Sequence, residues 1–181
     1  MTEFRRGLGS VALELVATVA DRPGARRERL VTTADLDAWL VGGGLLERAR
    51  SGASDLADAR ELRETIWRLV DSSRSDGRPG PRDRATLNDW ASRVPSQPQL
   101  RPDWTVRPRS GPDVTAALST VARDAVDLLG GPDRGRIRRC DRCTLLFVDR
   151  SRPGNRRWCS MQVCGNRSKA AEFRGRHRVI T

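Results

Sequence analysis

The chain has 181 residues, of which 37% are apolar, so it can bury one modest core and carry a small appended module. Its formal net charge of +11 favours a polyanionic partner. The apolar run from Val11 to Ala20 is interrupted by Glu14 and is too short for a membrane span or a signal peptide core. We therefore expect a cytoplasmic protein that does not insert into a membrane.

The apolar spacing in residues 1–129 predicts a domain of about five helices. The first spans residues 10–20. The second starts at the T-x-x-D signal of Thr32 and Asp35 and ends at the three glycines 42–44, which we interpret as a C-cap rather than a phosphate loop. The third, with Ser54 as its N-cap, is the most clearly amphipathic.

The second half of this domain is less regular. Residues 72–81 read as a loop, and a fourth, shorter helix ends at Pro95. Two prolines leave room for at most a short edge hairpin in residues 99–109, and the last helix begins near Pro112 and stops at the Gly-Gly-Pro of 130–132. Four tryptophans are predicted to line the core or a groove: Trp39, Trp67, Trp90 and Trp104.

No catalytic constellation stands out in the sequence. His177 is the single histidine, tyrosine is absent, and no metalloprotease, phosphate-loop or nucleophile-elbow pattern occurs. We therefore do not expect an enzyme.

Four cysteines form two close pairs, C-x2-C and C-x4-C, separated by fifteen residues: Cys140, Cys143, Cys159 and Cys164. Four thiolates in two pairs can close a tetrahedron around one Zn²⁺ ion. Two disulfides, which would need an oxidising compartment, and buried thiols without a metal are the alternatives. With four thiolates present, zinc needs no ligand from His177.

Around the cysteines the sequence predicts a treble-clef-like module. Residues 140–143 form a zinc knuckle, residues 145–148 a strand, and residues 156–159 the returning strand of a hairpin. A helix follows Cys164, and Trp158 is expected to cover the metal site. The predicted fold is therefore mainly α, with a helical domain at 1–129, a linker at 130–137 and the zinc module at 138–181.

Positive charge is concentrated in this module. From Arg136 onward 13 basic residues stand against three acidic ones, whereas residues 1–135 hold 21 basic and 20 acidic side chains. On the helix after Cys164, Phe173 is expected to face the knuckle, and Arg178 follows in the tail. The simpler explanation for the many arginines of this helix is solubility alone. We expect phosphate contacts instead, from Arg156, Arg157, Arg167, Lys169, Arg174 and Arg176.

The cysteine region resembles the CGNR zinc finger over residues 138–178. It contains Leu146-Phe147-x-Asp149-x-Ser151-Arg152, then Arg156-Arg157-Trp158-Cys159-Ser160-Met161, and Cys164-Gly165-Asn166-Arg167. The resemblance implies that Cys140, Cys143, Cys159 and Cys164 are the zinc ligands and that the finger binds DNA.

The N-terminal part resembles the ABATE domain, which precedes this finger in a family of bacterial stress-induced transcription regulators. The similarity rests on residues 9–19, on Leu36-x-x-Trp39-Leu40 and on Leu62-Arg63-Glu64. One departure is Ala17, where we expect an asparagine that would serve a polar pocket or a cap.

Together these features favour a DNA-binding regulator whose helical domain senses a small effector or forms a homodimer. Asn166 could pair with adenine, although we expect it to cap the helix. An RNA-binding protein is an alternative, but only three aromatic side chains are available for stacking in the module: Phe147, Trp158 and Phe173. A protein-interaction adaptor that recognises an acidic partner is another.

Overall fold

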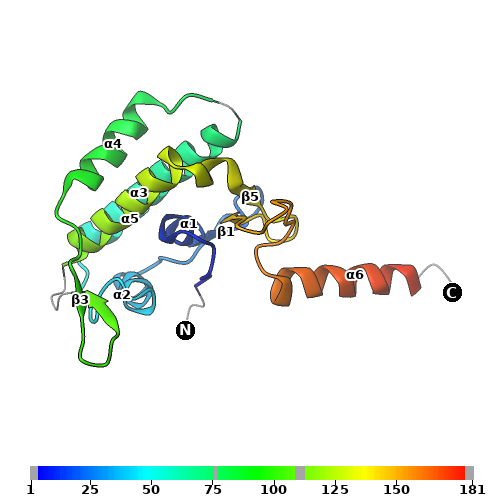
Figure 1. Cartoon of the computed structure of the whole chain (residues 1–181), viewed down its shortest axis with the longest axis horizontal. Helices are drawn as coiled ribbons and strands as arrows, with labels where there is room; N and C mark the ends of the chain where they lie inside the picture. Colours follow the sequence, from blue (N-terminus) through cyan, green and yellow to red (C-terminus); the bar gives the residue numbers. More distant parts are fainter. Residues whose placement is uncertain (1–3, 76, 109–112, 178–181) are drawn as a thin grey trace.

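The computed structural model describes residues 4–75, 77–108 and 113–177, without the side chains of 108 and 172–177. Six α-helices lie in this part of the chain (Figure 1): α1 (Val11–Val16), α2 (Thr33–Gly42), α3 (Ala53–Arg74), α4 (Pro81–Ser92), α5 (Val114–Gly130) and α6 (Asn166–His177). Three antiparallel strand pairs accompany them: β1 (Val19–Ala20) with β2 (Arg27–Glu28), β3 (Pro98–Leu100) with β4 (Val106–Pro108), and β5 (Ile137–Arg139) with β6 (Leu146–Val148). A 3-10 helix, η1 (Pro132–Arg136), and a π-helical turn, η2 (Met161–Gly165), complete the structure. The mainly α fold with a small C-terminal module is confirmed.

Helix α1 is shorter than predicted because a second element begins within the expected helix. The Ser10 side chain accepts a hydrogen bond from the Leu13 amide and so caps the start, where the Asp124 carboxylate of α5 also accepts from Ser10 Oγ and the Ala12 amide. The helix ends at Val16, and the chain then extends into β1, which pairs with β2. The predicted end at residue 20 was therefore wrong.

Of the N-caps predicted for the next two helices, the one for α2 was correct and the one for α3 was wrong. Thr32 and Asp35 form the predicted capping box of α2, and Gly43 is its C-cap. For α3 the N-cap is Gly52, not Ser54, because the Asp55 carboxylate accepts the Gly52 amide at 2.7 Å. This helix also continues through residues 72–74, which we had predicted as loop.

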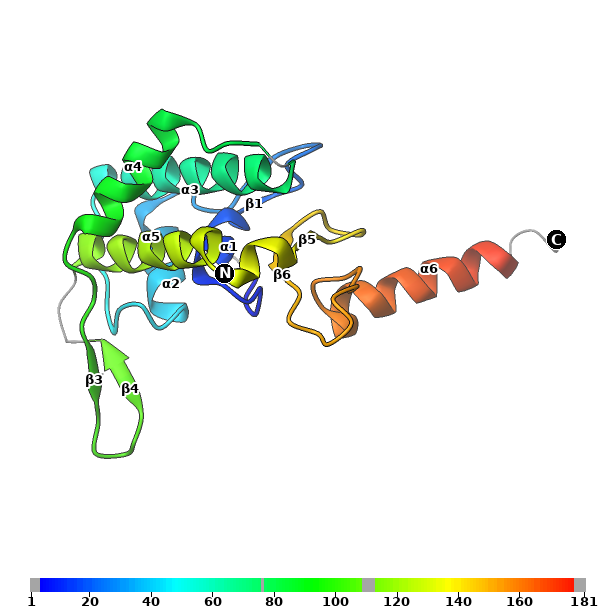
Figure 2. The same ribbon diagram turned by 45° about the horizontal axis from the view of Figure 1, so that its top comes forward.

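The strands β3 and β4 form the predicted short hairpin, and Figure 2 shows it projecting from the helical body. Trp104 lies in its turn with φ +64 and is 82% exposed, so the prediction that it lines the core or a groove was wrong. Trp39 and Trp90 are buried, and Trp67 lines a pocket.

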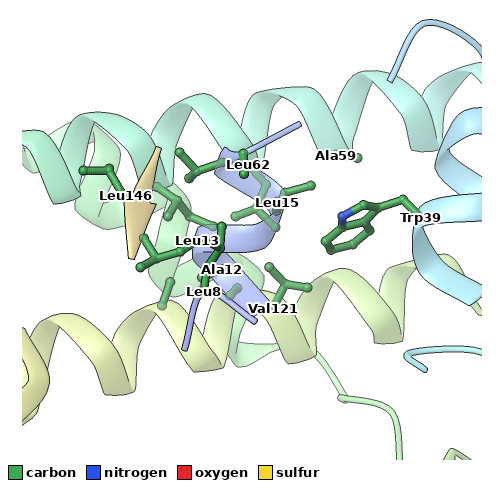
Figure 3. Packing of buried hydrophobic residues seen from close by; sticks show 14 of the residues in the cluster. Leu8, Ala12, Leu13, Leu15, Trp39, Ala59, Leu62, Val121 and Leu146 are labelled. Atoms are coloured by element: carbon green, nitrogen blue, oxygen red, sulfur yellow. The ribbon is translucent and has the colours of Figure 1, made fainter. Parts of the chain in front are cut away.

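The core is built around the short helix α1. Figure 3 shows Leu13 and Leu15 of α1 between α3 and α5, with Trp39 of α2 at one end and Leu146 of β6 at the other. All four side chains are less than a tenth exposed. Helical domain and zinc module therefore share one hydrophobic cluster.

The pair β5–β6 joins the two parts and replaces the hairpin that we predicted. We expected residues 156–159 to pair with the strand before them, but they form no strand, and the partner of β6 is β5, which precedes the knuckle. The Val148 amide donates to the Leu8 carbonyl oxygen at 2.9 Å. Gly9 has φ +86, and a Cβ there would lie 2.9 Å from Val148 Cβ, so only glycine allows this close approach.

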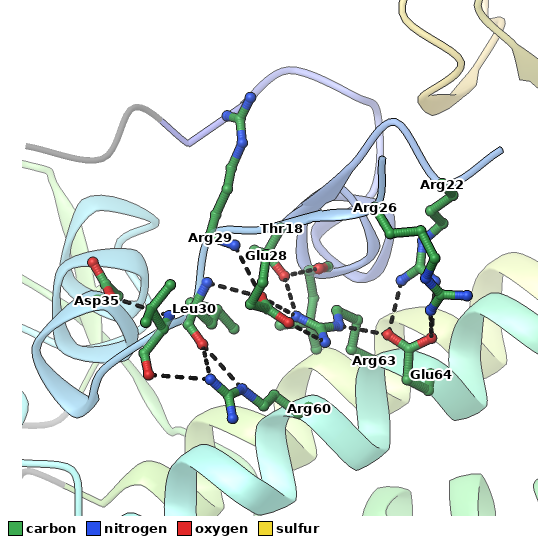
Figure 4. Close-up of polar contacts among 12 residues, drawn as sticks. Thr18, Arg22, Arg26, Glu28, Arg29, Leu30, Asp35, Arg60, Arg63 and Glu64 are labelled. Atoms are coloured by element: carbon green, nitrogen blue, oxygen red, sulfur yellow. Dashed lines mark hydrogen bonds and ion pairs between the residues drawn. The ribbon is translucent and has the colours of Figure 1, made fainter. Parts of the chain in front are cut away.

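A polar network fixes the β1–β2 ribbon to α3 (Figure 4). Arg63, only 4% exposed, donates from both terminal nitrogens to the Glu28 carboxylate at 2.7 Å and from Nε to Glu64 at 2.8 Å. It also donates to Thr18 Oγ1 at 3.1 Å, next to the position where Ala17 replaces the expected asparagine. Ala17 is the buried C-cap of α1, so its backbone performs the capping.

The last helix, α6, extends away from the body of the molecule in both overall views (Figures 1 and 2). Among the described helices, none is long and apolar enough to cross a bilayer.

Candidate metal centre and its basic surroundings

Four thiols gather where the knuckle meets the turn before α6. The Sγ atoms of Cys140, Cys143, Cys159 and Cys164 all lie within 4.8 Å of one another, and none is in a disulfide. The separations are 3.6 Å between Cys143 and Cys159 and 3.7 Å between Cys159 and Cys164. A tetrahedral site with Zn–S bonds of about 2.3 Å has sulfur atoms about 3.8 Å apart. The donor set and its size therefore fit Zn²⁺.

The knuckle is held by its own backbone. The Cys140 amide donates to the Leu145 carbonyl oxygen at 2.9 Å, and the Thr144 amide donates to the Cys140 carbonyl oxygen at 3.0 Å. Thr144 has φ +61, which reverses the chain directly after Cys143. The first two thiols are therefore held together by the turn that connects β5 to β6.

The second pair of thiols depends on a tight helical start. Ser160 is the N-cap, since its hydroxyl accepts from the Val163 amide, and its carbonyl oxygen accepts from the Cys164 amide at 2.9 Å. A Cβ on Gly165 would lie 2.7 Å from Met161 Sδ and 3.5 Å from the Trp158 ring, so the glycine of the C-G-N-R sequence permits this packing. The Trp158 ring thus packs beside Gly165, next to the metal ligand Cys164.

Asn166 does not cap the helix. Its backbone is helical, at φ −64 and ψ −40, because the helical run has already begun at the Ser160 cap. The expectation of a capping role was wrong, and the Asn166 side chain is exposed on the first turn of α6.

Asp149 has a structural role that sequence reasoning missed. It is fully buried, and its two carboxylate oxygens accept the amides of Ser151 at 3.0 Å and Arg156 at 2.8 Å. Burial by itself would raise the pKa of Asp149, but the hydrogen bonds from Ser151 and Arg156 lower it to about 2. The ionised carboxylate thereby closes the loop that returns the chain to Cys159. The sequence signal that could have indicated this role is the position of Asp149 within the zinc-finger motif.

Arg5 is a second residue that sequence reasoning missed. Its guanidinium donates to Cys159 Sγ at 3.6 Å. The hydrogen bond from Cys143 lowers the pKa of Cys159 to about 5. Burial acts to raise this pKa, and the hydrogen bond from Arg5 helps to lower it. The hydrogen bond with Cys159 raises the pKa of Cys143. Nothing in the sequence around Arg5 indicates this contact, which exists because the N-terminal segment runs beside the module.

The residues that we predicted to bind phosphate have different surroundings. Arg157 donates to Asp141 at 2.7 Å, and Arg156 donates to the Cys159 carbonyl oxygen at 3.1 Å, so both also brace the module. Arg167 and Lys169 are exposed on α6. The side chains of Phe173, Arg174, Arg176 and His177, and all of Arg178, lie outside the described residues.

The fold and the site define a helical domain joined to a four-cysteine zinc module. A family model described as "Putative stress-induced transcription regulator", ABATE, matches residues 9–132, and the model of the CGNR zinc finger matches residues 136–177. The chain belongs to the ABATE family and carries a CGNR zinc finger, so its cofactor is zinc. No curated protein matches the chain.

Proposed function

We propose that the chain is a DNA-binding transcription regulator in which one Zn²⁺ ion, held by Cys140, Cys143, Cys159 and Cys164, folds the C-terminal module. The close gathering of the four thiols carries this proposal. Four thiolates leave zinc no open position for a substrate, which favours a structural over a catalytic ion. Residues 1–129 and 138–181 are the proposed domains, with 130–137 between them, and the protein acts in the cytoplasm.

In this proposal the basic surface of the module contacts DNA phosphates through Arg156, Arg157, Arg167, Lys169, Arg174 and Arg176. The projection of α6 from the body supports it, because a free helix can approach a duplex without obstruction from the helical domain (Figure 1). Phe147 is 1% exposed and stacks under Arg156, with 5.4 Å from the guanidinium carbon to the ring centroid. The burial of this ring supports duplex DNA over single-stranded RNA, which is bound mainly by free aromatic rings.

The helical domain is proposed to sense an effector or to mediate self-association. A pocket of about 230 Å³ supports the first role, since Val16 and Trp67 line it from the helical domain and Leu145 and Leu146 from the module. A ligand there would contact both parts of the chain. The exposed apolar side chains of the β3–β4 hairpin, Trp104 among them, support the second role.

A salt-dependent binding titration tests the main proposal. Zinc-loaded protein is titrated into labelled duplex DNA between about 50 and 200 mM salt, with and without prior chelation. We expect binding that weakens with salt, is lost on chelation and falls at least tenfold in the double variant Arg167→Glu/Lys169→Glu. Arg84→Glu on α4 is the matched control, because Arg84 is exposed and lies on a helix remote from the module. Unchanged affinity in the double variant would contradict the assignment of α6.

A further inference from the structure

A hollow of about 580 Å³ lies where the helical domain meets the zinc module. The helical domain contributes residues around the β1–β2 ribbon, including Arg27 and Arg29, and the module contributes Arg142 of the knuckle and Arg167 of α6. Cys143 and Cys164 form part of the same wall. The hollow is therefore built by both parts of the chain and borders the metal centre.

The lining is strongly basic. Five arginines, the four above and Arg5, face a single acidic residue, Asp21. The Asp21 carboxylate accepts the Ala25 amide at 3.1 Å and so serves its own turn. Arg27 and Arg142 are exposed and form no ion pair with a carboxylate of the described residues. The unpaired charges of Arg27 and Arg142 create a positive potential that favours a bound anion.

The rest of the lining indicates which kind of anion fits. It consists of small or aliphatic residues and the two cysteines, and no aromatic ring of the described residues lines the hollow. A nucleotide effector would be recognised through its base, which needs a stacking partner or base-edge contacts. Guanidinium groups can bind phosphate oxygens without any contact to a base. The hollow therefore fits the sugar-phosphate backbone of a polymer better than a free nucleotide.

The hollow is continuous with the proposed DNA surface, because Arg167 belongs to both. Helix α6 begins one residue before Arg167 and extends outward from this point (Figure 2). Arg142 and Arg27 line the same hollow as Arg167 and are exposed, so they are accessible to the phosphates of a duplex that contacts α6.

We propose that the phosphate backbone of bound DNA passes through this hollow, where Arg27 and Arg29 of the helical domain act together with Arg142 and Arg167 of the zinc module. The inference rests on the proposed function and extends it. The helical domain forms part of the DNA-binding surface, which enlarges an interface that the small module alone would leave modest. A change in the helical domain that moves the β1–β2 ribbon would then alter DNA affinity directly.

The test uses the full, zinc-loaded chain and labelled duplex DNA at several salt concentrations. Arg27→Glu is expected to lower affinity about tenfold or more, and Arg27→Gln to reduce the slope of log K against log salt by about 1. Arg84→Glu is the control and should bind within about twofold of the wild type, as expected for an exposed charge outside the contact surface. Zinc content and melting temperature of each variant exclude a folding defect.

Three outcomes would overturn the inference. If Arg27→Glu binds like Arg84→Glu while Arg167→Glu is weakened, the helical domain makes no contact, and the proposed function survives. If the wild type shows no salt-sensitive binding, both the inference and the proposed function fail. If calorimetry with inorganic pyrophosphate shows saturable binding that Arg27→Gln abolishes, while DNA affinity is unchanged in that variant, the hollow is a small-anion site.

Discussion

Arg5 and Cys159 are 154 positions apart in the chain, and the Arg5 guanidinium donates to the Cys159 sulfur at 3.6 Å. The N-terminal segment thereby supplies a positive charge and a donor to the thiol cluster. Three residues further along, the Leu8 carbonyl oxygen accepts a hydrogen bond from Val148 of β6, so the same segment contacts both the metal centre and the shared core. Zinc binding and the folding of the helical domain should therefore be coupled.

Chelation of zinc is expected to destabilise the whole chain and not the module alone. Ile137, Leu146 and Val148 belong to the same hydrophobic cluster as α1, so loss of the metal loosens part of that cluster. We expect one zinc per chain and a melting temperature lowered by about 10 °C or more on chelation under reducing conditions. Metal analysis and thermal unfolding followed by helical circular dichroism check this. A helical transition unaffected by chelation would contradict the coupling.

Substitution Arg5→Ala is expected to weaken zinc binding about tenfold, as is typical when a residue that hydrogen-bonds a ligand is removed. The reason is that the Cys159 thiolate loses the cation that helps to lower its pKa. Competition with a coloured chelator measures the affinity. Arg5→Lys should restore part of it, and Arg84→Ala should have no effect. Equal zinc affinities in all four proteins would show that the contact is irrelevant to the metal.

Substitution Gly9→Ala tests the close approach of the two parts. An alanine there combines an unfavourable φ with a Cβ only 2.9 Å from Val148 Cβ, and we expect a loss of about 2 kcal/mol or more. Gly7→Ala is the matched control, since φ is +73 but no atom lies within 4 Å of its added Cβ. It should cost about 1 kcal/mol. Urea unfolding measures both, and equal losses would mean that contact with Val148 adds nothing.

Substitution Arg63→Leu tests the buried network on α3. It leaves Glu28 and Glu64 without their shared cation, and we expect a loss of about 3 kcal/mol at pH 7. Arg68→Leu on the same helix is the control, because Arg68 pairs with Asp83 while 48% exposed and should cost less than about 1 kcal/mol.

The Arg63 network also predicts a pH dependence. Burial acts to raise the pKa of Glu28 and Glu64, but the hydrogen bonds from Arg63 and Arg22 outweigh it and lower both below the usual 4.5. The stabilisation is thus complete above about pH 4.5 and is lost as the pH falls below it. The gap in unfolding free energy between wild type and Arg63→Leu should narrow between pH 5 and pH 3. A gap that stays constant would show that the carboxylates do not depend on Arg63.

Features with a local chemical signal could be predicted from the sequence. The capping box of α2 needs only Thr32 and Asp35 three residues apart, and the C-cap after it needs only glycines. The start of α3 was harder to predict, because two neighbouring residues could each mark it. Ser54 could be an N-cap itself, whereas the Asp55 carboxylate could accept the amide of an N-cap at Gly52. The sequence does not show which of the two hydrogen bonds forms.

Strand pairing in the zinc module could not be predicted in this way. Two short stretches, 137–139 and 156–159, could each have paired with β6, and both carry arginines that say little about register. The choice depends on Ile137 and Val148 reaching the core beside α1, a contact between distant parts of the chain.

The sequence by itself determined the zinc chemistry, the helical class of the first domain and the charge of the second part, because ligand spacing, apolar periodicity and net charge are local properties of the chain. Only the tertiary structure decided that Arg5 lies against Cys159, that Trp104 is exposed and that Arg27 and Arg142 line one hollow. These relationships join residues from distant segments. They follow from how α1 and β6 pack into one core, which no local pattern encodes.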